Sequence, residues 1–321
     1  MANYLHITLK NMKNFCYPTC TLFAVILALY LFTSCINQIS DDSESDEPVM
    51  VHVSFSGFNL SYDEDDAATR AVVPASNADV NRIALSVFDS NNDLVYKTTR
   101  NSMIDTEDFD QISCSLVPGN YTFVAVAHKA TANGDEAAVI TSSTEATINT
   151  AKLSKTFAVV NSSVTVDAEE TNNVTLAFGK RISSQFQLLM TDDTPDEVAV
   201  CEIILNPSEA TTTAYKLNPT TGKALNTHQY KLVVNLSELG YNNLKGKTIG
   251  VHCLVTEEEQ NMDVTINMKN SSDAIVKTLT LHDVPMAPHR VTQAKGNFFH
   301  TSAGTSFTFD TENDPLHTIN F

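Results

Sequence analysis

Alternation of apolar and polar residues is the dominant pattern of the chain after residue 48. In the segment 49–60, Val49, Val51, Val53 and Phe55 share one face, which predicts a long strand with one buried face. Similar segments recur along the chain, separated by Gly, Pro, Asn and Asp. The later segments predicted as strands are 82–88, 94–98, 112–116, 120–127, 155–160, 163–167, 173–178, 184–190, 198–205, 212–217, 229–236, 248–256, 262–267, 275–281, 290–299, 306–309 and 317–321.

Many short strands with frequent turn residues are typical of all-β sandwiches or partly open barrels. Long helical periodicity is missing, and the polar, small-residue stretch 130–143 predicts a long loop with one helical turn at most. At 321 residues, the chain has room for two domains. We therefore expect two β-sandwich-like domains in tandem, 49–180 and 181–321.

The first 34 residues have the pattern of a secretory signal. Lys10 and Lys13 precede a short apolar run that ends at Phe32, and Thr33 and Ser34 supply small residues for peptidase cleavage. The apolar run is shorter than the roughly 20 residues that a membrane-spanning helix needs. Met12 is an alternative start to Met1, because the basic residue Lys13 would then follow it directly.

Cys35 is the candidate lipidation site. The sequence Leu31-Phe32-Thr33-Ser34-Cys35 resembles a bacterial lipobox, in which the cysteine thiol accepts a lipid after cleavage before it. The alternative is ordinary signal cleavage with Cys35 as a bystander. Several acyl chains would give a stable membrane anchor, whereas a single chain binds only marginally.

The segment 35–48 is predicted to be a solvated tether. Its core, Asp41 to Glu47, consists of acidic residues and serines and cannot form a packed core. It resembles the acidic surface-export signal that follows the lipidated cysteine in lipoproteins of the Bacteroidia. A plain spacer is the alternative.

Composition argues against several other classes of protein. The formal net charge of −18 disfavours binding to nucleic acid. We find no catalytic or cofactor-binding motif and no metal-ligand spacing. The turn Asp89–Asp93 begins like a calcium loop, but Leu94 and Arg100 stand where such a loop needs Gly and Glu, so we predict a hairpin turn. We therefore expect no enzyme, no cofactor and no metal.

Three cysteines remain in the predicted mature chain after Cys35. They are widely spaced, and Cys114, Cys201 and Cys253 form no CxxC pair. One disulfide is compatible with this count, but buried thiols in strands fit the strand pattern around them better.

The order of several motifs resembles the fimbrillin and fimbrial-anchor families of Bacteroidia-type (type V) pili, in particular the FimB-like anchor branch. The motifs, in chain order after the lipobox, are Ile83–Asp89, Leu116–Ala127, Val174–Phe186, Thr191–Pro195 and His289–Phe299. The resemblance implies two transthyretin-like β-sandwich domains and a structural role. Other fimbrial subunits, bound by strand exchange, and the outer membrane are the implied partners, with host or bacterial surface ligands for adhesion.

Arg70 is the candidate processing site that the resemblance implies. In stalk subunits of the family, a protease cuts after an arginine that follows the first strand, and a strand from the next subunit then fills the open groove. Arg70 lies between acidic and small residues, a setting typical of exposed, cleavable loops, although an ordinary solvated arginine fits as well. The segment 306–321 is the candidate donor strand.

Two functions remain open from the sequence. The first is a surface-exposed lipoprotein of the outer membrane that serves as an anchor, stalk or tip subunit of a fimbria and supports cell adhesion. The second is a surface glycan-binding lipoprotein. Such proteins usually bind sugars on exposed aromatic side chains, and this chain has no Trp and only 9 Tyr for that purpose.

Overall fold

Strands are the regular secondary structure of the chain in a computed structural model, and no helix occurs in the part that it describes. The residues described are 47–57, 80–102, 104–105, 108–130, 136–179, 181–300 and, for the backbone alone, 317–320. They belong to one compact unit, Ser45–Phe321. The prediction of an all-β protein is confirmed.

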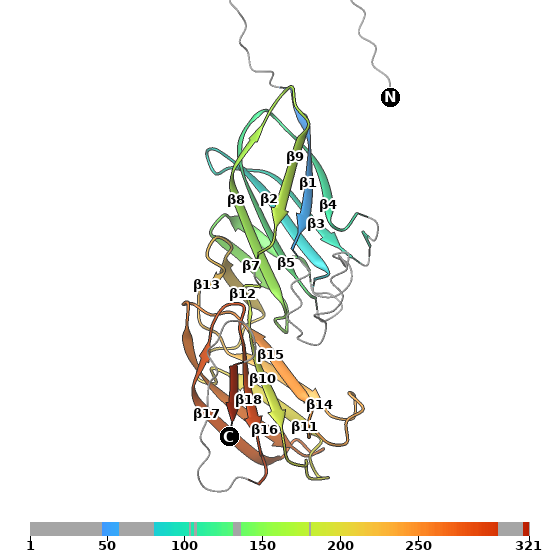
Figure 1. Ribbon diagram of the computed structural model, residues 1–321, viewed down its shortest axis with the longest axis vertical. Coiled ribbons are helices and arrows are strands. Elements are labelled where there is room, and N and C mark those ends of the chain that lie inside the picture. Colours follow the sequence, from blue (N-terminus) through green and yellow to red (C-terminus); the bar gives the residue numbers. More distant parts are fainter. Residues whose placement is uncertain are drawn as a thin grey trace, which may run out of the picture. The chain divides into compact units, whose positions relative to one another are not determined.

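Two sheets of the N-terminal half face each other across a core. The first has the order β4-β1-β9 and the second the order β3-β2-β5-β8 (Figure 1). The bounds of these strands are β1 Val49–Ser56, β2 Arg82–Asp89, β3 Leu94–Asn101, β4 Gln111–Leu116, β5 Gly119–His128, β8 Thr156–Val166 and β9 Asn172–Ala177. Residues of both sheets, among them Val53, Leu85 and Phe123, form a single buried cluster, as the alternating pattern predicted.

Two further sheets of the C-terminal half pack in the same manner. Their orders are β15-β10-β18-β19 and β14-β11-β16-β17. The bounds of these strands are β10 Ser184–Met190, β11 Val200–Leu205, β14 Tyr230–Asn235, β15 Thr248–Cys253, β16 Gln260–Lys269, β17 Ile275–Met286, β18 Val291–Gly296 and β19 His317–Asn320. Phe186 and Val251 of the first sheet share a buried core with Ile203 and Ile266 of the second.

A fifth sheet, with the order β13-β12-β7-β6, combines strands from both halves of the chain. The bounds are β6 Val139–Ser142, β7 Glu145–Asn149, β12 Ala214–Asn218 and β13 Lys223–Ala224. The prediction of a loop over 130–143 is therefore wrong at its end, where β6 begins. The segment is short, and its hairpin partner β7 pairs in turn with the distant β12, so no local pattern marks it.

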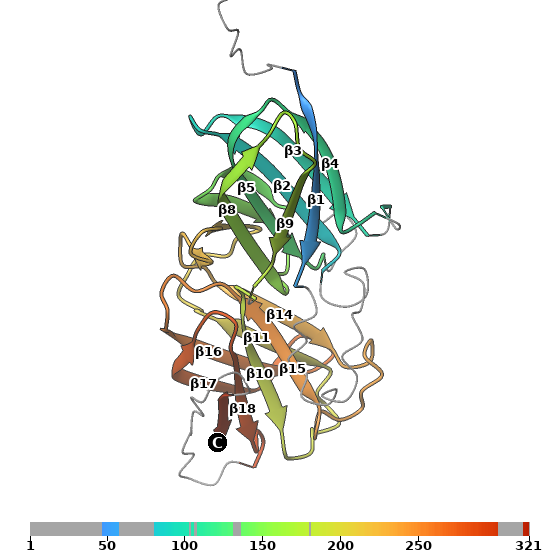
Figure 2. The same ribbon diagram turned by 45° about the horizontal axis from the view of Figure 1, so that its top comes forward.

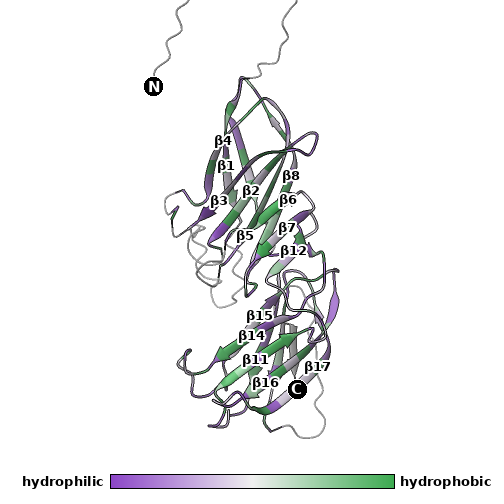
Figure 3. Cartoon of the chain, turned by 180° about the vertical axis from the view of Figure 1, so that it is seen from behind, coloured by the Kyte–Doolittle hydropathy of each residue, from purple (hydrophilic) through white to green (hydrophobic). Residues whose placement is uncertain are grey.

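This fifth sheet covers one face of the sheet β3-β2-β5-β8. The outward-facing side chains of β2 and β5 on that face, such as Ala84 and Val126, belong to the same buried core as Ile140 and Ile148 of β6 and β7. That core continues into the C-terminal half through Phe186. In Figure 3, the strands on this side carry both hydrophobic and hydrophilic residues. The boundary near residue 180 stays a prediction.

β8 is one strand where two were predicted, at 155–160 and 163–167. It pairs with β5 throughout, and a register shift opposite Tyr121 and Phe123 absorbs the polar interruption at Asn161. Near this point the hydroxyl of Tyr121 donates a hydrogen bond to the carbonyl oxygen of Val117, at 2.6 Å. This contact fixes the turn that leads into β5.

Candidate functional site: the first strand and the Asp192 junction

The first strand, β1, lies in the middle of its sheet. It runs antiparallel to β4, with Val51 opposite Cys114, and parallel to β9, with Val53 opposite Val174. Figures 1 and 2 both show β1 between these two neighbours. Loss of β1 would therefore leave two strand edges unpaired.

One face of β1 is part of the hydrophobic core. Val51, Val53 and Phe55 are buried, and the ring of Phe55 lies 5.9 Å from that of Phe178, centroid to centroid. Burial of three such side chains contributes roughly 5–9 kcal/mol. The net stability of a domain is about 5–15 kcal/mol. Removal of β1 would therefore demand a replacement strand of similar pattern.

The opposite face of β1 is polar and forms side-chain pairs with both neighbours. The Nδ1 atom of His52 lies 3.0 Å from the hydroxyl of Ser113 on β4. The hydroxyl of Ser54 lies 3.2 Å from that of Thr175 on β9. These pairs fix the register of β1 on both sides and add to the backbone ladders.

The end of β1 is held tightly against the end of β9. Gly57 has a φ of +89°, and a Cβ atom there would lie 2.0 Å from the carbonyl oxygen of Phe178. The N–H of Phe178 donates to the carbonyl oxygen of Ser56 at 2.9 Å. Glycine is therefore required at the point where the chain leaves β1.

The two processing residues expected from the sequence flank β1 along the chain. Cys35 precedes it and Arg70 follows it, and both lie outside the described residues. The described chain starts at Glu47, two residues before β1 begins. The acidic segment that follows Cys35 therefore leads directly into a central strand of the fold.

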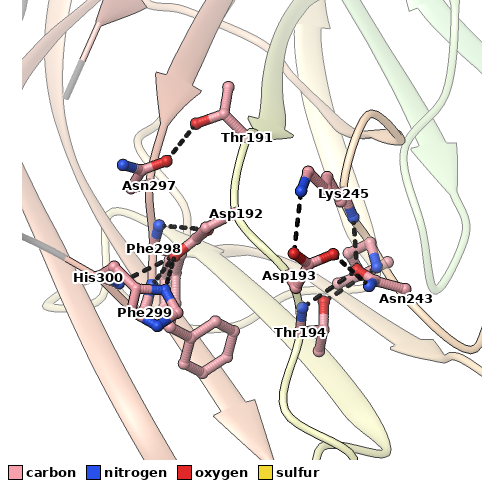
Figure 4. Close-up of polar contacts among 11 residues, drawn as sticks. Thr191, Asp192, Asp193, Thr194, Asn243, Lys245, Asn297, Phe298, Phe299 and His300 are labelled. Atoms are coloured by element: carbon pink, nitrogen blue, oxygen red, sulfur yellow. Dashed lines mark hydrogen bonds and ion pairs between the residues drawn. The ribbon is translucent and has the colours of Figure 1, made fainter.

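A second cluster of polar contacts joins two segments that the sequence had marked as family-like motifs. Asp192, in the turn 191–195, is buried and accepts three backbone N–H bonds from the end of the motif 289–299 and the next residue (Figure 4). The donors are Phe298 at 2.8 Å, Phe299 at 2.6 Å and His300 at 2.9 Å. The hydroxyl of the neighbouring Thr191 donates to the Asn297 side-chain oxygen at 2.6 Å.

The protonation of Asp192 reflects this environment. Burial alone would raise its pKa, but the N–H bonds from Phe298, His300 and Phe299 outweigh burial, and the pKa lies below its ordinary value. The imidazole of His300 lies 3.3 Å from the carboxylate and favours the charged form further. Asp192 is thus an anion held by backbone dipoles.

Asp193 points to the other side of the same turn (Figure 4). Its carboxylate accepts bonds from Lys245 and from the Asn243 amide, each at 2.9 Å, and these contacts lower its pKa. The hydroxyl of Thr194 accepts the backbone N–H of Leu244 at 2.9 Å. The sequence predicted this turn but not the segments that it holds together.

We call the contacts between Asp192 and the backbone of residues 298–300 the Asp192 junction. This junction fixes the point from which the C-terminal segment starts. Beyond it, β19 returns to pair in parallel with β18, with Thr292 opposite His317. β19 lies at the edge of its sheet and has β18 as its neighbour. An edge strand can leave without breaking a sheet, whereas the central β1 cannot.

Other kinds of chemistry find little support in the described residues. Cys114, Cys201 and Cys253 are free and buried, in agreement with the prediction of buried thiols. Within the described part of the chain no group of three or more His, Cys, Asp or Glu residues is arranged to hold a metal ion. In the same part, none of the elements is a helix long and apolar enough to cross a membrane.

Comparison with known proteins identifies the family. Residues 43–298 match the family model of the fimbrillin-A associated anchor proteins Mfa1 and Mfa2. The chain belongs to this family of fimbrial structural and anchor proteins, and the resemblance seen in the sequence is confirmed. A search of curated proteins found no match.

Solved structures with similarity to the chain include two fimbrial proteins. The fimbrial anchor protein Mfa2 from Porphyromonas gingivalis has 10% identity and a TM-score of 0.41, with 73% of this chain and 83% of that chain covered. A fimbrial assembly protein from Parabacteroides distasonis has 11% identity and a TM-score of 0.44, with 78% of this chain and 91% of that chain covered.

Proposed function

We propose that this chain is a lipid-anchored subunit that holds a fimbria on the outer membrane, at the cell surface. The anchor is the lipid on Cys35, and the acidic segment 36–48 spans the distance between the membrane and β1. The fimbria that it holds supports cell adhesion. Membership in the family of fimbrillin-A associated anchor proteins supports a structural role of this kind.

The order of Cys35, β1 and Arg70 along the chain sets the condition under which this chain can act as an anchor. A cut after Arg70 would separate the body of the protein from both β1 and the lipid on Cys35. Anchoring therefore requires that Arg70 stays uncut and that β1 stays in place. The match to the family of anchor proteins is the single observation that carries this proposal, and the central position of β1 between β4 and β9 is compatible with a strand that stays in place.

β1 is well placed to bear load. Tension from the tether would act along the strand, so the backbone hydrogen bonds to β4 and β9 would be loaded in shear, and many would have to break together. The buried Val51, Val53 and Phe55 would also have to leave the core at the same time. Such a strand resists extraction better than an edge strand.

Strand exchange is the proposed mode of assembly with other fimbrial subunits. The segment 306–321 is the proposed donor to a neighbouring subunit, and the part of it that the structure describes, β19, pairs at a sheet edge. A donated strand gains main-chain hydrogen bonds and side-chain pockets in the acceptor.

Replacement of Cys35 by alanine tests the proposal. The Cys35→Ala protein should be exported but released from the membrane fraction, and fimbriae should detach into the medium. Replacement of Cys114 by alanine is the matched control, because that thiol lies in the core and should not affect membrane association. Membrane retention of Cys35→Ala with fimbriae still attached would contradict the proposal.

A further inference from the structure

A groove of about 1080 Å³ lies beside β6, away from β1 and from the Asp192 junction. Residues of β2, β3, the segment 104–105 and the segment 136–141 line it. Three of these side chains are large, apolar and exposed: Leu94, Ile104 and Val139. Apolar residues that gather around a groove in this way often mark an interaction site.

The groove lies where one further strand of the fifth sheet would fit, next to β6. β6 packs over β2 and β5, because Ile140 shares a buried core with Ala84 and Val126. Among the described strands, the fifth sheet ends at β6, whereas the sheet beneath it continues to β3, so no described strand covers the part of the lower sheet at β3. One more strand, about 4.8 Å beyond β6, would lie over that part.

The floor of the groove consists of small and polar side chains. Ala84, Ser86, Lys97 and Thr99 line it, and they lie on the same side of the β2–β3 pair by register, with Ala84 opposite Thr99 and Ser86 opposite Lys97. Bulky apolar side chains do not fill this floor. Side chains of an added strand could therefore reach Lys97 from above.

The charges of the groove differ from those of the chain as a whole. Three cations and two anions line it, in a protein with a formal net charge of −18. Arg100 pairs with Asp105 at 3.6 Å, and the guanidinium of Arg82 donates to the Asn101 side chain at 2.7 Å. The side-chain ammonium group of Lys97, by contrast, makes no hydrogen bond or ion pair with another residue of the described chain. It is the cation left for an incoming carboxylate.

We propose that this groove binds an extended acidic segment of a partner protein. The segment adds to the edge of β6 that no described strand pairs with, as a further strand of the fifth sheet, and places a carboxylate against Lys97. Main-chain hydrogen bonds supply affinity, and the Lys97 contact selects for acidic segments. The inference does not depend on lipidation of Cys35 or on the fate of β1.

Synthetic peptides test the proposal. The probe is a labelled peptide of about nine residues that alternates valine with glutamate, and its counterpart carries lysine in place of glutamate. Fluorescence anisotropy with the full mature protein should show binding of the acidic peptide alone. Hydrogen exchange should slow at the amides of β6 when that peptide is bound.

Three variants locate the site. Lys97→Glu should weaken binding of the acidic peptide about tenfold and should gain binding of the lysine peptide. Lys295→Glu makes the same charge change at an exposed position on β18 and should bind as the wild type does. Thr99→Trp, at an exposed floor position, should block the groove and abolish binding.

Several results would overturn the proposal. Equal affinity of the wild type and Lys97→Glu for the acidic peptide would remove the role of the charge. Protection at β17 or β19 in place of β6 would put the binding site elsewhere. Full protection of β6 in the peptide-free protein would mean that the chain itself fills the groove. Each outcome leaves the anchoring proposal untouched, because that proposal rests on Cys35 and β1.

Discussion

Gly57 and Phe178 hold together the ends of the first and ninth strands, at a separation that admits no side chain on residue 57. The carbonyl oxygen of Phe178 occupies the place of a Cβ atom, at 2.0 Å, and the φ of Gly57 is +89°. The chain must therefore leave the central strand β1 at this glycine. The contact fixes the boundary between β1 and the segment that contains Arg70.

Replacement of Gly57 by alanine should destabilise the protein by at least about 2 kcal/mol, because the left-handed conformation is strained for alanine and its Cβ clashes with Phe178. Urea unfolding measures the effect. Gly240→Ala shares the positive φ but has open space around it, so it should cost less, and Gly179→Ala should be nearly neutral. Equal losses for Gly57 and Gly240 would show that the close contact is unimportant.

The Asp192 junction should also prove essential for stability. In Asp192→Asn an amide group replaces one of the two acceptor oxygens and faces a backbone N–H, so we expect a loss of about 2–3 kcal/mol. Asp193→Asn is the control, since Asp193 is exposed and pairs with Lys245 at the surface. If the two variants unfold at the same urea concentration, the three N–H bonds to Asp192 contribute nothing special.

The same junction predicts a dependence on pH. The pKa of Asp192 is lowered in the folded protein, so its stabilising contribution is complete above the unfolded value near 3.8. It is lost as the pH falls through the lower folded value. Wild type and Asp192→Asn should therefore differ most above pH 4 and converge in stronger acid. A difference that grows on acidification would contradict this assignment.

Glu202 on β11 provides a second acid-sensitive contact. Burial raises its pKa, but the bonds from Lys231, Asn267 and Lys269 lower it to about 2. Its contribution should thus be present above pH 4.5 and be lost between about pH 4.5 and 2.

Solvent screening at the half-exposed Lys231 reduces the contribution of this contact to about 2 kcal/mol. Urea unfolding of Glu202→Gln against the wild type at several pH values measures it. Glu145→Gln, at an exposed pair with Lys216, is the control and should change little. A constant difference between Glu202→Gln and the wild type across pH 2–5 would exclude the proposed ionisation.

The buried cysteines should be unreactive in the folded state. Burial raises the pKa of Cys114 to about 11 and the pKa of Cys201 and of Cys253 to about 12. Maleimide at pH 7.5 should label none of these three thiols in the native protein and all three in denaturant. Mass spectrometry counts the labels. Fewer than three labels at these positions after denaturation without reductant would reveal a disulfide.

Local pattern was sufficient to predict strands whose partners are near in sequence or whose faces alternate cleanly. The hairpin of β2 and β3 is an example, because Asp89 accepts the N–H groups of Asn91 and Asp93 and closes the turn within the segment itself. The alternation of β1 likewise predicted its buried face. Both features depend on residues within a few positions of each other.

Other features depend on distant partners that a single sequence does not reveal. β6 pairs with the adjacent β7, but β7 pairs in turn with β12, far along the chain, and the sequence around 130–143 is small and polar. The role of Asp192 requires the backbone N–H of Phe298, so the sequence predicted the turn but not the hydrogen bonds that join it to a distant segment. The placement of β1 between β4 and β9 is of the same kind.

The anchoring account is tested most directly by the N-terminus of the protein taken from the outer membrane of intact cells. Mass spectrometry of the N-terminal peptide should find acylated Cys35, joined without a break through residues 49–56 and past Arg70. A protein that begins at Ala71, without lipid and without β1, would contradict the account and identify a processed stalk subunit.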